Sequence, residues 1–185
     1  MLENYQGSML KKGLSKKLRM NFKNIKKNFY IILIIPFFIF ILDRISKIYV
    51  INLSKSVIDK ELFSSKFLNI TLIWNEGIAF GLFSFNQDYF YNFLTLIILL
   101  VVFIVLMMAI KNKGYQKYAL LMILGGALGN LYDRVFFRAV PDFIDLHVEN
   151  FHWFIFNIAD IFITFGVIML ILWEILPTNK NYEKR

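Results

Sequence analysis

The sequence predicts an all-α membrane protein with four transmembrane helices and a small extracytoplasmic β-sheet. Three observations support this fold class. Hydrophobic residues make up 58% of the 185 residues and charged residues only 18%, which is too apolar for a soluble domain of this size. Four apolar segments each approach the roughly 20 residues that cross a bilayer. A long connection between the first two segments contains a stretch rich in β-forming residues.

The helices are expected at about residues 28–50, 89–110, 116–134 and 156–176. The third segment is the weakest because it contains several glycines. For the first segment the alternative is a cleaved secretory signal peptide. Charged Asp43 and Arg44 follow its apolar centre instead of a small-residue cleavage site, so we reject that alternative.

Composition excludes several classes of function. Cysteine is absent, which leaves no disulfide framework, no cysteine-ligated zinc and no thiol nucleophile. The net charge of +8 does not indicate nucleic-acid binding, because eight of the 21 basic residues lie between Lys11 and Lys27, directly before the first apolar segment. We therefore expect membrane lipid, and no nucleic acid, among the partners of this protein.

Lysine and arginine are concentrated on one side of the predicted bundle. Both terminal tails and the 111–117 connection are basic, whereas the 135–155 connection carries only Arg138. The cations of the 51–88 connection are diluted by acids. By the positive-inside rule, both termini are cytoplasmic and the two long connections face outward.

This topology divides the chain into a cytoplasmic basic tail at 1–27, a membrane domain at 28–176 and a cytoplasmic tail at 177–185. The membrane is expected to be a bacterial cytoplasmic membrane, which the chain crosses several times. Residues 1–8, MLENYQGS, are expected to be a remnant of cloning that precedes a native Met9.

Three of the four predicted helices carry an aspartate at the same depth. With a rise of about 1.5 Å per residue, Asp43 and Asp133 each lie roughly 24 Å beyond a basic residue at the cytoplasmic boundary. Asp160 lies roughly 25 Å before Pro177 at the same boundary. Acidic residues are costly in hydrocarbon, so we expect a polar layer inside the bundle, near the outer surface.

Charged neighbours on the first helix support this layer. Asp43 and Lys47 are four residues apart, share a helix face and are expected to pair. Arg44 is expected to extend to the membrane interface, as long cationic side chains near helix ends do.

The third helix contributes small and polar residues. Gly125 and Gly129 form a small-xxx-small pair that lets another helix approach closely. Asn130, Asp133 and Arg134 then follow on one polar stripe. We expect Asp133 and Arg134 to form a structural ion pair.

The first outer connection is expected to build the sheet, and both outer connections are expected to form an aromatic belt. Residues 67–74, FLNITLIW, alternate partly and predict a short strand, with Gly77 and Gly81 as turn or bulge points after it. Aromatic side chains of both connections are expected to anchor at the membrane interface. They are Trp74, Phe80, Phe83, Phe85, Phe151, Trp153 and Phe154.

Two further carboxylates suggest a chemistry. Asp142 lies in the second outer connection and Asp160 at the start of the fourth helix, so the returning chain can bring them together. Two close carboxylates share one proton: the ionised one activates water and the protonated one polarises a peptide carbonyl, as in aspartic proteases. The alternatives are a solvated turn residue at 142 and a helix cap at 160.

Five blocks of the sequence resemble the lipoprotein signal peptidases, also called type II signal peptidases, in order and approximate spacing. The blocks are DRISK, NEGIAF, GGALGNLYDR, VPDFID and FNIAD, and the resemblance spans about residues 28–176. It implies a bacterial four-helix aspartyl endopeptidase of the inner membrane. Such enzymes cut prolipoproteins just before a diacylglyceryl-modified cysteine. Residues 51–88 would supply the family's β-cradle, and Pro141 stands where the family often has valine.

The resemblance also assigns residues to roles. Asp142 and Asp160 are the implied catalytic dyad. The residues that match the family's supporting positions are Asp43, Lys47, Asn75, Gly77, Asn130, Asp133, Arg134 and Asn157. Depth in the membrane alone would favour Asp133 and Asp160 as the dyad. The resemblance instead assigns Asp142 as the partner of Asp160 and leaves Asp133 as a structural residue. Asn130 and Asn157 are expected to hydrogen-bond the carboxylates or the substrate backbone.

The implied substrate carries its own apolar signal helix and a lipid, and both enter laterally between helices. No cofactor or metal is expected, because His147 and His152 lack a HExxH pattern; chelators should therefore have no effect. A serine mechanism is disfavoured by the lack of GxSxG, and we expect a monomer. The alternative functions are a small transporter that uses the Asp/Lys/Arg layer, which has no inverted repeat in its favour, and a non-catalytic assembly or lipid-binding protein.

Overall fold

The computed structural model describes residues 29–56, 61–77 and 87–176. The two predicted terminal tails lie outside these residues, as do Gly81 and the aromatic residues Phe80, Phe83 and Phe85. From Ile35 onward the chain forms one compact unit, and the contacts described below belong to it.

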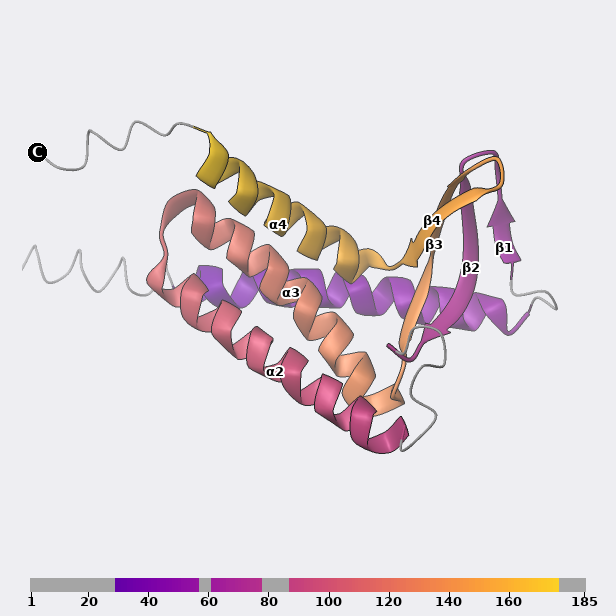
Figure 1. Cartoon of the computed structure of the whole chain (residues 1–185), viewed down its shortest axis with the longest axis horizontal. Coiled ribbons are helices and arrows are strands. Elements are labelled where there is room, and N and C mark those ends of the chain that lie inside the picture. The colour runs from indigo at the N-terminus through magenta and orange to yellow at the C-terminus, as the bar shows by residue number, and fades with distance from the viewer. Residues whose placement is uncertain (1–28, 57–60, 78–86, 177–185) are drawn as a thin grey trace, which may run out of the picture. The chain divides into compact units, whose positions relative to one another are not determined.

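The four predicted helices are confirmed (Figure 1). They are an unlabelled first helix at Phe29–Ser54, α2 at Gln87–Lys111, α3 at Gly114–Phe137 and α4 at Ile158–Ile175. Among the described residues, each of the four includes a stretch whose length and hydropathy suffice to cross a bilayer. Most of their large apolar side chains point outward, as expected of helices whose solvent is lipid.

A four-stranded antiparallel sheet packs at one end of the helices (Figure 1). Its strands follow the order β1 (Glu61–Ser64), β2 (Leu68–Asn75), β3 (Val140–Val148) and β4 (Phe151–Phe156). The strand predicted at 67–74 is thus confirmed as β2. The connection at 135–155, in contrast, is a hairpin that the sequence did not predict. Its first strand is buried on both faces from Val140 to Phe143, which removes the alternation that marks a strand.

A small hydrophobic cluster holds the sheet against the helices. Val50 from the first helix, Leu72 from β2 and Phe143 from β3 are all buried in it. Ile158, the first residue of α4, packs against the same cluster. These contacts bring the ends of the first helix, β3 and α4 to one place.

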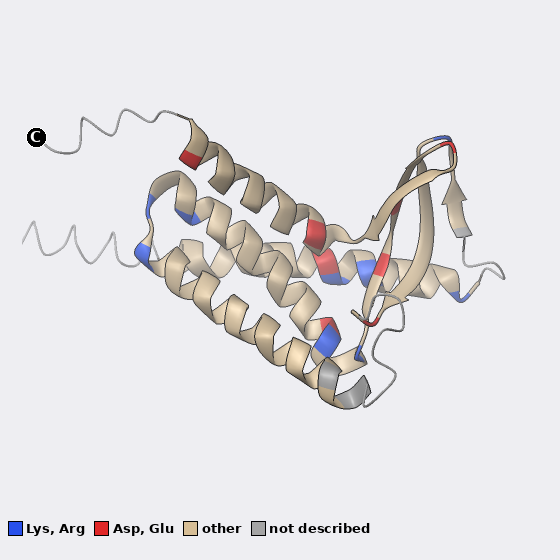
Figure 2. Cartoon of the chain, viewed as in Figure 1, with Lys and Arg blue, Asp and Glu red and all other residues tan. Residues whose placement is uncertain are grey.

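Charged side chains are rare along the middle of the helices (Figure 2). They gather at the α2–α3 connection and at the level where the helices approach the sheet. This second group corresponds to the predicted polar layer.

Candidate active site

The centre of the polar layer is a buried ion cluster. Asp43, Lys47 and Asp133 are all 0% exposed. Lys47 Nζ donates to the two carboxylates at 2.9 and 2.7 Å and to Asn130 Oδ1 at 2.9 Å, so each of its three protons has an acceptor. Arg44 binds Asp133 with both terminal nitrogens and Asp43 with one of them. The predicted Asp43–Lys47 pair is confirmed, and two cations balance two carboxylates.

Two predictions at this cluster are wrong. The Arg44 side chain does not extend to the interface; it is 12% exposed and lies within the cluster. Asp133 pairs with Arg44 and Lys47, because adjacent residues of a helix, such as Asp133 and Arg134, do not face each other. Arg134 instead donates to the backbone oxygen of Asn130 at 3.4 Å. Charge balance could have predicted the contacts of Arg44, because two buried acids require more than one cation.

Close helix packing makes this cluster possible. A Cβ atom added at Gly129 would lie 2.5 Å from Asp43 Oδ2, and one added at Gly125 would lie 2.7 Å from Ile39 Cβ. The predicted role of both glycines in helix packing is therefore confirmed. At this separation the side chains of the first helix reach the polar stripe of α3.

The start of α4 is bound to the cluster by hydrogen bonds. Asn157 is the N-cap and forms a capping box with Asp160: Asn157 Oδ1 accepts from Asp160 N at 3.2 Å, and Asp160 Oδ2 accepts from Asn157 N at 3.1 Å. Asp43 Oδ1 accepts from the buried amide of Ala159 at 3.1 Å. The cap considered for Asp160 therefore exists, but it uses only one carboxylate oxygen.

Three asparagine amides point their NH₂ groups at the two proposed catalytic carboxylates. Asp142 accepts from Asn75 Nδ2 at 2.8 Å and from Asn157 Nδ2 at 2.6 Å. Asp160 Oδ1 accepts from Asn130 Nδ2 at 2.7 Å. The expectation that Asn130 and Asn157 bind the carboxylates is confirmed.

The orientation of each amide is determined by the hydrogen bond that its oxygen accepts. Lys47 donates to the oxygen of Asn130, and a lysine has no acceptor, so the NH₂ group of Asn130 must face away from it. The backbone N–H of Gly77 donates to the oxygen of Asn75 at 2.8 Å. Gly77 has a φ of +75°, which a side chain disfavours, so this turn depends on glycine.

Asp142 is a buried strand residue, not a solvated turn residue. It is 3% exposed and lies in β3. Burial raises the pKa of its carboxyl group above the ordinary value, and the charge of Asp160 raises it further. The hydrogen bonds from Asn75 and Asn157 and the charge of Lys47 act in the opposite direction, but the pKa remains raised. Asn157 links the two acids, since it donates to both of them.

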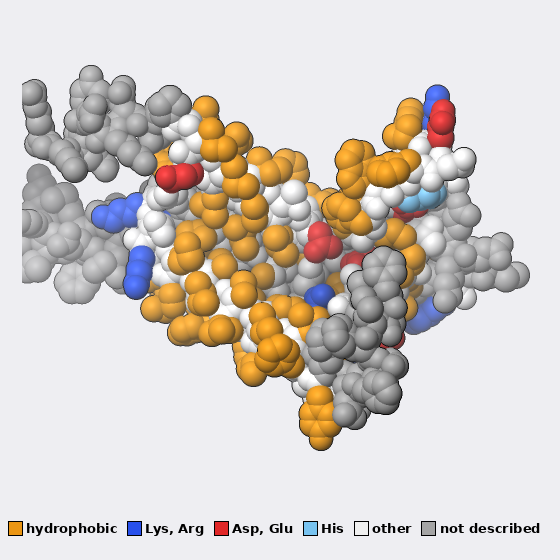
Figure 3. Space-filling model, in the orientation of Figure 1, with side chains coloured by type: hydrophobic (Ala, Val, Ile, Leu, Met, Phe, Trp, Pro, Cys, Tyr) orange, Lys and Arg blue, Asp and Glu red, His pale blue; other side chains and the backbone are white. Residues whose placement is uncertain are grey.

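Each acid borders a cavity. Asp160 lies in the wall of a groove of about 340 Å³ between β4 and α4, whose other walls include Trp153, Phe156 and Phe165. Figure 3 shows this hollow between the helices and the sheet, with hydrophobic side chains on both sides of an acidic one. Asp142 borders a second cavity of about 360 Å³. The site thus offers one carboxylate in the wall of an apolar groove and the other at a second cavity.

The chain is similar to known proteins over most of its length. A family model described as signal peptidase (SPase) II matches residues 35–176. A lipoprotein signal peptidase of Pelagibacter ubique (strain HTCC1062) is 48% identical over 159 residues, which cover 86% of this chain and 96% of the relative. One of Anaplasma phagocytophilum (strain HZ) is 42% identical over 135 residues, which cover 72% of this chain and 85% of the relative.

Solved structures share the fold. One, described as a bacterial membrane enzyme determined by the in meso method at 2.3 Å resolution, has a TM-score of 0.61 and 32% identity, and the match covers 83% of this chain and 92% of that one. Another with the same description at 1.9 Å resolution has a TM-score of 0.63 and 34% identity, covering 80% and 94%. The combination of four apolar helices and a small sheet is therefore that of known membrane enzymes.

Proposed function

The chain belongs to the signal peptidase II family, and from this membership we propose that it is an aspartyl endopeptidase which removes signal peptides from prolipoproteins. Cleavage occurs at the bond before a diacylglyceryl-modified cysteine, and Asp142 and Asp160 are the catalytic pair. The observation that carries this proposal is the position of Asn157. Its side-chain amide donates to Asp142 and its backbone N–H donates to Asp160, so one residue holds both acids.

The two acids work with one shared proton. Burial raises the pKa of Asp142, which favours the protonated form there, and Asp160 is then the ionised partner. Asp160 takes a proton from water as the water oxygen attacks the peptide carbonyl carbon, while Asp142 gives its proton to the carbonyl oxygen. When the intermediate collapses, Asp160 protonates the leaving nitrogen and Asp142 recovers its proton from the hydroxyl group.

The groove beside Asp160 suits an apolar substrate. Its walls come mainly from β4 and α4 and are mostly aromatic and aliphatic. The signal helix and the lipid of the precursor enter laterally from the membrane, and the scissile bond meets the acids near the outer surface, where water is available. We expect the protein to act as a monomer in the cytoplasmic membrane, with both termini inside and membrane lipid around the helices.

The test compares Asp142→Asn and Asp160→Asn with the unsubstituted protein in a gel-shift assay on a diacylglyceryl-modified precursor. Each substitution is expected to reduce cleavage by about 10²-fold to 10⁴-fold, the usual contribution of a general acid or base. Glu149→Gln is the matched control, because it makes the same chemical change at an exposed turn residue. A folded variant of either catalytic acid that cleaves at the full rate would overturn the dyad.

Two further arms separate this proposal from its alternatives. The chemistry uses no metal ion, so cleavage is expected to continue in EDTA; a complete loss that zinc restores would favour a metalloprotease. Reconstitution into liposomes distinguishes the transporter. Ion or solute flux without hydrolysis of the precursor would support transport and contradict the peptidase.

A further inference from the structure

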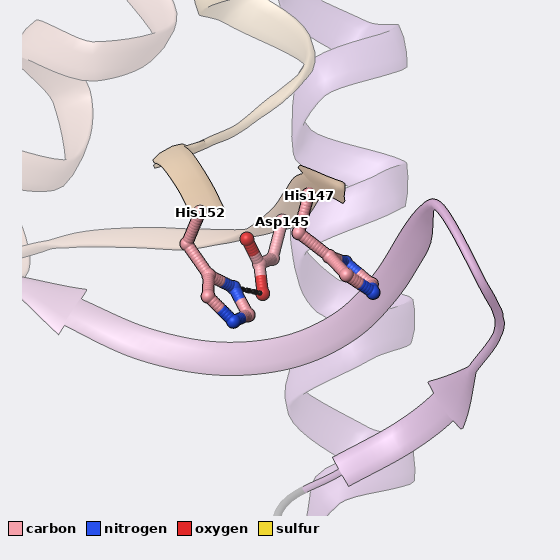
Figure 4. A group of neighbouring side chains, drawn as sticks. All are labelled: Asp145, His147 and His152. Carbon is pink, nitrogen blue, oxygen red and sulfur yellow. Dashed lines mark hydrogen bonds and ion pairs between the residues drawn. The ribbon is translucent and has the colours of Figure 1, made fainter. Parts of the chain in front are cut away.

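A second cluster of polar side chains lies on the sheet, away from the catalytic pair. Asp145 and His147 are two residues apart on β3 and therefore point to the same face of the strand. His147 is paired across the hairpin with His152 of β4. Figure 4 shows the carboxylate of Asp145 between the two imidazole rings. One ligand atom from each residue lies within 4.8 Å of the others.

A β-bulge brings the third member into the cluster. Between the pairs Asp145↔Ile155 and His147↔His152, β3 advances by two residues and β4 by three. The extra residue of β4 changes the direction of its side chains, as bulges do next to functional sites. In the sequence, the two histidines were compared only with HExxH, which is a helical pattern. Such a pattern does not detect residues that face each other across a pair of strands.

Two buried atoms of this cluster are without a hydrogen-bond partner among the described residues. They are Asp145 Oδ1 and His147 Nδ1. Asp145 is 5% exposed, and its other oxygen contacts His152 Nδ1 at 2.8 Å. Buried polar atoms are almost always satisfied, so two unsatisfied atoms on neighbouring side chains indicate a ligand that binds both. A cation fits, because a carboxylate oxygen and an imidazole nitrogen both donate electron pairs to metals.

We propose that Asp145, His147 and His152 bind one divalent transition-metal ion of the zinc class. Two imidazoles and one carboxylate are a known donor set for Zn²⁺, with water in the fourth position. The His152 side chain is 53% exposed, which gives the ion and its water access from solvent. Metal–ligand bonds of about 2.0–2.2 Å require the three donors to move slightly inward from their present spacing.

The ion joins the two strands that lead to the proposed catalytic pair. Asp142 precedes Asp145 by three residues on β3, and β4 ends directly before Asn157, the N-cap of the helix that carries Asp160. Binding therefore stabilises the hairpin and takes no part in the hydrolysis itself. This inference does not depend on the proposed peptidase activity, since it concerns the affinity of the sheet for a metal.

The experiment measures Zn²⁺ binding to the metal-stripped full chain in detergent, purified without a polyhistidine tag. The chain contains only two histidines, and both belong to the cluster, so every imidazole ligand reports on this site. Titration calorimetry is expected to give one Zn²⁺ per chain, and Zn²⁺ is expected to raise the Tm of the protein. His147→Ala and His152→Ala are each expected to weaken binding at least tenfold and to abolish the rise in Tm.

Matched variants keep the result decisive. Asp145→Asn preserves the shape of the side chain but removes the charge, and it is also expected to weaken binding at least tenfold. Glu149→Gln removes a nearby carboxylate outside the cluster and is expected to bind like the unsubstituted chain. If a variant does not fold, the X-ray absorption spectrum of the zinc-loaded, unsubstituted protein identifies the ligands instead. Two imidazole ligands are expected. Absence of Zn²⁺ binding, or full binding without both histidines, would overturn the proposal.

Discussion

At the residue scale, the site depends on side chains that have only one possible orientation. The side-chain oxygen of Asn130 accepts a hydrogen bond from Lys47, so its NH₂ group faces Asp160. Asn75 is oriented in the same way by the N–H of Gly77. The two proposed catalytic acids thus receive hydrogen bonds from neutral amides, while Arg44 and Lys47 bind two other acids, Asp43 and Asp133. Without a bound cation, a close pair of carboxylates retains a proton most easily.

Replacing Asn75 with leucine tests where that proton resides. The amide of Asn75 donates to Asp142 and lowers the pKa of its carboxyl group, so removing the amide raises that pKa further. If Asp142 must be protonated for catalysis, activity is lost as the pH rises through this pKa. The alkaline limb of a plot of kcat/KM against pH is therefore expected to move to higher pH in Asn75→Leu. A limb that moves to lower pH would place the proton elsewhere.

Replacing Lys47 with methionine tests the ion cluster. Methionine has a similar length but leaves the fully buried Asp43 and Asp133 with one cation. Breaking a buried ion pair costs about 3–5 kcal/mol, so we expect the free energy of unfolding to fall by about that amount. Denaturant unfolding in detergent measures it. Lys113→Met, at an exposed lysine, is the control and is expected to change stability by less than about 0.5 kcal/mol. Equal losses in both variants would contradict the role of the cluster.

At the scale of elements, the site requires the close approach of α3 to the first helix. Gly129→Ala is expected to push Asp43 away from its partners, because the added methyl group would lie 2.5 Å from its carboxylate. Overpacking of this kind costs about 1–3 kcal/mol of stability, and a displaced site typically loses about 10²-fold in rate. Thermal unfolding and the cleavage assay measure the two effects.

Gly114→Ala separates packing from backbone strain. No atom lies within 4 Å of a Cβ added at Gly114, but its φ of +58° is unfavourable for alanine. We expect a stability loss of about 1 kcal/mol with cleavage unchanged. If Gly129→Ala behaves in the same way, close packing at Gly129 is not needed for activity.

The sequence predicts features that lie within one helix or strand. It does not predict features that depend on contacts between two elements. The helices follow from continuous apolar runs, β2 from partial alternation, and the Asp43–Lys47 pair from their spacing in one helix. The β3–β4 hairpin was missed because β3 is buried on both faces at its start. The contacts of Arg44 with Asp133 were missed because they join two helices. The assignment of Asp142 came from resemblance, since spacing alone had favoured Asp133.

At the scale of the whole molecule, charge determines how the chain lies in the membrane. The α2–α3 connection is basic, whereas the polar layer and the sheet lie at the opposite ends of these helices. Helices with this asymmetry insert with the basic connection in the cytoplasm. The predicted orientation therefore places the proposed catalytic pair near the extracytoplasmic surface, which the described aromatic residues Trp74, Phe151, Trp153 and Phe154 would anchor with their exposed side chains.

Single cysteines test this orientation directly, because the chain has none of its own. Ser65, between β1 and β2, and Lys113, between α2 and α3, are both exposed. A membrane-impermeant maleimide is expected to label Ser65→Cys in intact cells and Lys113→Cys only after the membrane is permeabilised. Both variants should retain cleavage activity, because neither residue touches the acids or their partners. The opposite labelling pattern would place the sheet in the cytoplasm, where the proposed enzyme would not meet a precursor whose cysteine lies at the outer surface.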